Sequence, residues 1–193
     1  MEAIINKLGG ENGVDLFLRG ELTVSAPTRQ WREENGVIYF SVTSDGTTGK
    51  DWIKRLEGNG FRVEDYAKQV LRSPDFKPTS GVTTEVAVLK GELFTDKDRI
   101  TDKIRAEADK RKLSKPNAEV ACLIREKFTD KDLEAMGLRY IVVMHDPIKN
   151  SFDDLYLLFA CRSGDGRSMA ADCIFPGGGW VSGSGFAFAV SFS

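Results

Sequence analysis

The sequence of 193 residues lacks the features that would assign it to several common functional classes. Its formal net charge is −2, from 27 basic and 29 acidic side chains. There is therefore no excess of positive charge with which to bind nucleic acid or an anionic membrane surface. No apolar run approaches the roughly 18 residues of a membrane-spanning helix. We expect no nucleic-acid partner and no membrane segment.

Residues that bind metals or carry redox chemistry are also scarce. The three cysteines, Cys122, Cys161 and Cys173, are an odd number without the spacing of a zinc site, and we expect free thiols in a reducing compartment. His145 is the only histidine, and Asp146 follows it. Such a pair could act as a base oriented by a carboxylate, although no second histidine or neighbouring nucleophile accompanies it. We expect no metal and no cofactor, and catalysis by His145 and Asp146 is kept as an alternative.

The N-terminal residues 1–7 have neither the basic stretch nor the long apolar stretch of a secretory signal. We therefore expect synthesis in the cytoplasm. Display at a cell surface would need a route that the sequence does not show, and the final location is left open.

The periodicity of the chain predicts a mixture of helices and strands. Alternation that involves β-branched and aromatic residues predicts a strand over 37–42, and alternation of Val and Thr predicts one over 82–89. The stretch 138–144 is predicted to be a buried strand. Asn35-Gly36 predicts a hairpin turn before the first of them. Helices are predicted over 9–20, 50–57, 63–71, 96–115, 118–128 and 130–136. These elements do not alternate as βαβ units, so the predicted class is α+β.

Residues 45–52, Asp-Gly-Thr-Thr-Gly-Lys-Asp-Trp, lie between a predicted strand and a predicted helix, where a phosphate-binding loop would lie. Ser44 replaces the first glycine of the P-loop pattern, and Asp51 replaces its Ser/Thr. A carboxylate at that place would oppose a bound phosphate and its metal. We favour a turn followed by a helix N-cap.

The C-terminal segment has an unusual composition. From Leu155 to Ser193 there is no Lys, Glu, Gln, Asn, Thr or His, although the preceding chain is rich in Lys and Glu. Residues 156–159 and 186–192 predict strands at its two ends. Exposed loops are normally built from the missing residue types. The segment is therefore either buried or shaped by something other than solubility.

Two kinds of position can be separated within this segment. The first kind suits a framework: Leu157, Leu158, Arg162, Asp165, Gly166, Arg167, Met169, Pro176, Trp180, Gly185, Phe186, Phe188 and Val190. The second kind shares no packing role: Phe159, Cys161, Ser163, Ser168, Ala170, Asp172, Cys173, Phe175, Gly178, Val181 and Ser184.

The segment resembles the variable region of the target proteins of diversity-generating retroelements. In that family, adenines of a template repeat are randomised during reverse transcription and copied into the C-terminal end of the protein gene. Randomising the first two bases of an Asn codon yields residues such as Phe, Ser, Cys, Ala, Asp, Gly and Val, but not Lys, Glu, Gln, Met or Trp. Every residue of the second kind is reachable in this way, whereas Met169 and Trp180 are not.

The resemblance implies a fold and a function. The fold would be C-type lectin-like, with short antiparallel strands and several helices, in a single domain over 1–193. The variable region would cover 157–185 and lead into a closing strand that begins at Gly185-Phe186. Residues 60–76, Gly-Phe-Arg-Val-Glu-Asp-Tyr and onward, are similar to variable proteins of the archaeal type. Asp165-Gly166-Arg167-Ser168 stands where phage-type members carry Gly-Gly-Ser-Trp, which favours the archaeal subclass.

The implied function is non-enzymatic binding of an unknown protein or cell-surface ligand through the eleven positions of the second kind. A site that tolerates many sequences needs rigid anchors, so we expect Trp180, Phe186, Phe188 and Val190 to be buried and the variable positions to face solvent together. The alternatives are an ordinary α+β protein with a buried glycine-rich C-terminal hairpin, and an enzyme that uses His145 and Asp146.

Overall fold

The computed structural model describes residues 5, 10–22, 29–150, 152–163, 166–174 and 177–191. The chain divides into two units, 1–30 and 31–193, and each is described by itself. The first unit contains helix α2 (Glu11–Leu18), which confirms the helix predicted over 9–20. Its last three side chains, Leu16, Phe17 and Leu18, are exposed.

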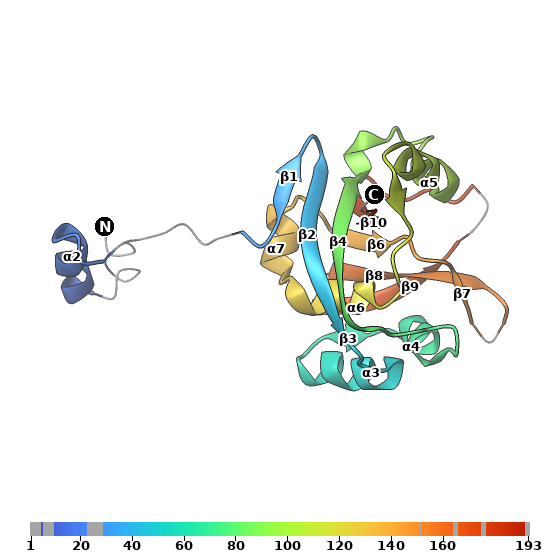
Figure 1. Cartoon of the computed structure of the whole chain (residues 1–193), viewed down its shortest axis with the longest axis horizontal. Coiled ribbons are helices and arrows are strands. Elements are labelled where there is room, and N and C mark those ends of the chain that lie inside the picture. Colours follow the sequence, from blue (N-terminus) through green and yellow to red (C-terminus); the bar gives the residue numbers. More distant parts are fainter. Residues whose placement is uncertain are drawn as a thin grey trace. The chain divides into compact units, whose positions relative to one another are not determined.

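A mixed β-sheet forms the centre of the second unit (Figure 1). Its strands are β1 (Arg32–Glu34), β2 (Val37–Asp45), β3 (Arg62–Val63), β4 (Ser80–Lys90), β5 (Leu113–Ser114), β6 (Tyr140–Val143), β7 (Ile148–Lys149), β8 (Leu155–Ser163), β9 (Gly166–Cys173) and β10 (Ser184–Val190). The main order is β1-β2-β4-β10-β6-β8-β9-β3, while β5 pairs with β10 and β7 with β8. The pairs β10–β6 and β3–β9 are parallel, and the other pairs are antiparallel.

Helices cover both faces of this sheet. They are α3 (Gly49–Gly58), α4 (Asp65–Arg72), α5 (Thr101–Lys110), α6 (Val120–Lys127) and α7 (Asp130–Ala135), with a short 3-10 helix η1 (Gly91–Leu93). Side chains of α3, α4, α6 and α7 share one core with one face of the sheet. Phe94 and two residues of α5, Ile104 and Ala108, share a second core with the other face. Figure 1 shows α3 and α4 well apart from α5.

Within the described residues the chain has six α-helices, α2 included, and ten strands in one sheet, which confirms the α+β class. The predicted turn is present, because Asn35 and Gly36 both have positive φ, 50° and 74°. Thr129 caps α7 through a reciprocal pair of hydrogen bonds with Asp132. In the described part of the chain, no helix is long and apolar enough to cross a membrane.

The turn between β2 and α3 confirms the N-cap interpretation of residues 45–52. The Asp51 N–H donates to the Thr48 hydroxyl at 3.3 Å, and that hydroxyl donates to the Asp51 carboxylate at 2.7 Å. Gly49 serves packing, because a Cβ added there would lie 1.8 Å from the carbonyl oxygen of Leu71 at the end of α4. The glycine therefore lets α3 approach α4 closely.

The region between the two predicted C-terminal strands contains a further strand, which sequence periodicity did not indicate. β9 pairs antiparallel with β8 from Tyr156–Cys173 to Ser163–Gly166. Its residues are mostly small, so the alternation of apolar and polar side chains that marks a strand is weak. Pairing with β8 is what makes this stretch extended.

Candidate binding site around Trp180

The register of the C-terminal strands brings several predicted variable positions onto one face of the sheet. Phe159 and Cys161 of β8 pair with Ala170 and Ser168 of β9. Tyr140 of β6 pairs with Cys161 on one side and with the start of β10 on the other. Directly paired residues point to the same face, and so do residues two apart on a strand. The variable positions that share this face are Phe159, Cys161, Ser168, Ala170, Asp172 and Ser184.

Five of the predicted positions are accessible to solvent. Asp172, Gly178 and Val181 are exposed, while Phe159 and Cys173 are half-buried. Ser163 is the last residue of β8, and Phe175 lies outside the described residues. Cys173 pairs with Tyr156, and its side chain packs against the core on the opposite face of the sheet. We call the other four accessible positions, Phe159, Asp172, Gly178 and Val181, together with Trp180 the Trp180 surface.

Four positions with small side chains are buried instead: Cys161, Ser168, Ala170 and Ser184, whose exposed fractions are 7%, 0%, 3% and 1%. The expectation that they face solvent is wrong. Their short side chains stay close to the sheet, where each strand is flanked by a strand on either side. The larger rings of Tyr140 and Phe159, 5.8 Å apart and edge to face, stand on the same face.

Two adjoining hollows open on this face beside Trp180. The first has a volume of about 260 Å³ and is lined by Tyr140, Val142, Phe159, Asp172, Gly179, Trp180, Val181 and Ser184. The second has a volume of about 180 Å³ and is lined by Thr101, Asp172, Cys173, Ile174, Gly178, Gly179 and Trp180. Every member of the Trp180 surface lines at least one of the two hollows.

Trp180 is fixed by polar and aromatic contacts. Its backbone N–H donates to the carbonyl of Arg99 at 2.8 Å, and its indole N–H donates to the Thr101 hydroxyl at 3.1 Å. Its ring meets that of Phe186 edge to face at 6.2 Å. The predicted anchors Phe186 and Phe188 are buried, whereas Trp180 and Val190 are half-buried. Trp180 is therefore rigid and accessible at the same time.

Arg99, which sequence reasoning missed, ties this loop to η1. Its buried guanidinium donates to the carbonyls of Gly91 at 3.0 Å, Phe94 at 3.0 Å and Trp180 at 3.3 Å. It also pairs with Asp96 at 3.0 Å. Arg99 stands in a run of alternating charges, so the sequence offers no signal that separates it from its solvated neighbours. Its role follows only from the long-range contacts.

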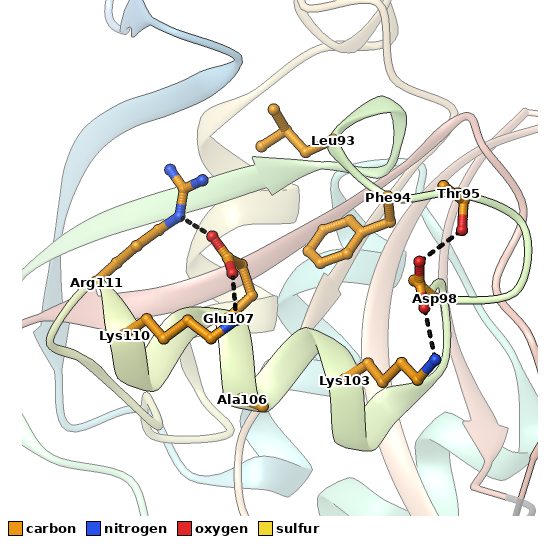
Figure 2. A pocket seen from close by; sticks show the side chains of 9 residues that line it. All are labelled: Leu93, Phe94, Thr95, Asp98, Lys103, Ala106, Glu107, Lys110 and Arg111. Carbon is orange, nitrogen blue, oxygen red and sulfur yellow. Dashed lines mark hydrogen bonds and ion pairs between the residues drawn. The ribbon is translucent and has the colours of Figure 1, made fainter.

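A larger hollow, of about 390 Å³, lies between η1 and α5 (Figure 2). Its charged side chains pair with one another: Lys103 with Asp98 at 2.5 Å, and Glu107 with Lys110 at 3.3 Å and Arg111 at 2.9 Å. The charges of this hollow are thus satisfied from within, and no predicted variable position lines it.

His145 is a buried structural residue. The Leu158 N–H donates to its Nε2 at 3.0 Å, so Nδ1 carries the proton and donates to the carbonyl of Asp146 at 2.6 Å. Burial lowers the pKa of the imidazole to about 4. The Asp146 carboxylate pairs with Lys115 at 2.6 Å, and the hydrogen bond from Lys115 lowers the pKa of that carboxyl. The pair therefore lacks the arrangement of a base oriented by a carboxylate.

The thiols are free, as predicted. Burial raises the pKa of all three, Cys122, Cys161 and Cys173, so each stays protonated at neutral pH. Among the described residues, no group of three or more His, Cys, Asp or Glu side chains could hold a metal ion.

No protein-family model, curated protein or solved structure matches this chain. The sequence pattern and the geometry of the Trp180 surface are what point to a function.

Proposed function

We propose that this chain is a non-enzymatic ligand-binding protein and that the Trp180 surface is its binding site. One observation carries the proposal. Phe159, Asp172, Gly178 and Val181 were selected as interchangeable from the sequence and the resemblance, and they line two adjoining hollows. They come from β8, the end of β9 and the loop before β10.

Because the C-terminal segment resembles the targets of diversity-generating retroelements, we further propose that these positions are diversified and that the ligand is a protein or another cell-surface molecule. The local framework suits such a role. The backbone ladders of β8, β9 and β10 and the contacts of Trp180 with Arg99 and Thr101 do not depend on the side chains at these four positions. The assignment of the α+β fold to a C-type lectin-like class of the archaeal type belongs to this proposal and rests on the resemblance alone.

The four buried positions have a different role in this proposal. Cys161, Ser168, Ala170 and Ser184 lie beneath the surface, and their small side chains let the strands and rings above them pack. A buried position in a filled core tolerates little added volume. Diversification there would be restricted to small residues among the variants that fold.

Two libraries test the proposal. In the first, Phe159, Asp172, Gly178 and Val181 are randomised together, and in the second the four buried positions are randomised. Surface display followed by protease challenge measures the folded fraction of each. Most members of the first library should stay folded and yield binders to unrelated purified proteins, and most of the second should not fold.

An ordinary α+β protein with a buried C-terminal hairpin is the alternative, and the burial of four of the eleven positions favours it. On that account the first library should fold but yield no binders to unrelated proteins. A folded first library without binders, or equal losses of the folded state in the two libraries, would contradict the proposed function.

A further inference from the structure

Three aromatic rings line the hollow of about 260 Å³ beside Trp180. Tyr140, Phe159 and Trp180 are each half-buried, so part of each ring is accessible from the hollow. Val142 and Val181 complete an otherwise apolar wall. The face of an aromatic ring carries negative potential and attracts an ammonium or guanidinium group within about 6 Å.

Asp172 is the only charged residue among the described residues that line this hollow. Its side chain is exposed, and one carboxylate oxygen accepts a hydrogen bond from the Cys173 N–H at 2.8 Å. No Lys or Arg of the described ranges lies within ion-pair distance of it. The hollow therefore combines aromatic faces with an uncompensated negative charge.

One cation of the chain lies near the Tyr140 ring. The exposed Arg139 places its guanidinium 5.7 Å from the centre of the Tyr140 ring. Its stem packs beside Gly183, and the next residue, Ser184, lines the hollow. Arg139 does not line the hollow, but its charge opposes the entry of a second cation.

We propose that this hollow accepts an organic cation on an apolar stem, supplied by a Lys or Arg side chain of a partner protein. This proposal rests on the proposed function. It states which chemical group of a ligand the side chains now present at the variable positions would bind. The volume is below the roughly 300–1,000 Å³ of pockets for drug-sized ligands, which suits a single side chain. Insertion of one such side chain into an aromatic pocket is typical of the energetic centre of a protein interface.

The test is an NMR titration of the full chain with capped single amino acids. The probes are the N-acetyl methylamides of lysine, arginine and the neutral norleucine, and the signal is the indole N–H of Trp180, assigned with Trp180→Phe. Both cationic probes should shift this signal saturably and leave the indole signals of Trp31 and Trp52 in place. Norleucine should bind about tenfold more weakly or not at all.

Three variants separate charge recognition from simple packing. Asp172→Asn should weaken binding of the lysine probe about fivefold, because the carboxylate is lost. Arg139→Met should tighten it about twofold, because a competing charge is removed. Asp75→Asn is the control and should leave it unchanged, since Asp75 is exposed beside Phe76, which packs against the opposite face of the sheet.

Equal binding of norleucine and lysine, no shift with any probe, or an unchanged affinity in Asp172→Asn would each overturn the inference. If tetramethylammonium bound about tenfold more tightly than the capped amino acids, the source would be a small free amine and not a partner's side chain. None of these results bears on the folded fractions of the two libraries, so the proposed function stands or falls separately.

Discussion

His145 is the residue at which the fold most directly opposes protonation. Its two ring nitrogens hold backbone groups of Leu158 and Asp146, and burial lowers its pKa from 6.5 to about 4. Between these two values the unfolded chain binds a proton that the folded chain does not. Folding stability is therefore unaffected above pH 6.5 and falls as the pH drops from 6.5 to 4. The total loss in the free energy of unfolding between these pH values is on the order of 3 kcal/mol.

Because His145 is the only histidine, its titration can be followed without ambiguity. The imidazole signal in NMR should titrate near pH 4 in the folded protein. Urea unfolding at pH 7 and pH 4.5 should show a loss of stability that is smaller in His145→Gln, which keeps a donor and an acceptor but binds no proton. A titration near 6.5, or the same loss in both proteins, would contradict this account.

The division of the variable positions into buried and accessible ones predicts opposite tolerance to one large side chain. Ala170 is buried, so Ala170→Phe should destabilise the protein by about 1–3 kcal/mol through overpacking. Val181 is 57% exposed, so Val181→Phe should change stability by no more than about 0.5 kcal/mol. Urea unfolding of the two variants measures both effects. Similar changes in the two variants would show that the division is wrong.

The sequence pattern and the resemblance together selected positions several of which meet in space, but they did not predict which of them are buried. Mutation of an Asn codon at its first two bases can yield both Ala170 and Val181. This criterion concerns the codon and carries no information about the surroundings of the residue in the fold. Burial is set by the strands on either side and by rings such as that of Tyr140, which is distant in sequence. Thr101 and Arg99 were missed for the same reason.

At the scale of the elements, the contact of α3 with α4 depends on a single glycine. A methyl group at Gly49 would lie 1.8 Å from the Leu71 carbonyl oxygen, so Gly49→Ala requires the two helices to separate. We expect the free energy of unfolding to fall by about 3 kcal/mol or more, which is typical of a severe steric conflict in a core. Thermal or urea unfolding measures it.

Gly58, at the other end of the same helix, is the matched control. Nothing lies within 4 Å of a Cβ added there, so Gly58→Ala should leave stability unchanged or raise it by up to about 1 kcal/mol through helix propensity. An equal loss in both variants would show that the close approach of Gly49 to Leu71 does not explain the first result.

Strands whose side chains alternate strongly along the chain were predictable from the sequence. Strands that are extended only because they pair with a neighbouring strand were not. β2 carries β-branched and aromatic residues, β4 carries Val and Thr in alternation, and both were identified, as was the hairpin turn at Asn35-Gly36. The small residues of β9 have little preference of their own, and eight pairs with β8 hold the strand extended. Strand propensity depends on such context.

At the scale of the whole chain, the α+β class was predictable because helical and strand periodicities are both present without a βαβ rhythm. The order of the sheet was not, since β10 lies between β4 and β6, whose sequences are far from it along the chain. That placement aligns Ser184 with Tyr140 and brings the loop of Trp180 beside β8 and β9. The candidate site is thus a product of long-range pairing.

The central claim, a binding surface diversified by a retroelement, is tested most directly by sequencing the DNA around the gene. The account predicts a near-copy of the segment that encodes residues 157–185, beside a gene for a reverse transcriptase, with differences only where the copy has adenine. It also predicts differences in the codons of Phe159, Asp172 and Val181 and none in that of Trp180. The absence of such a copy, or differences spread over all four bases, would contradict the claim.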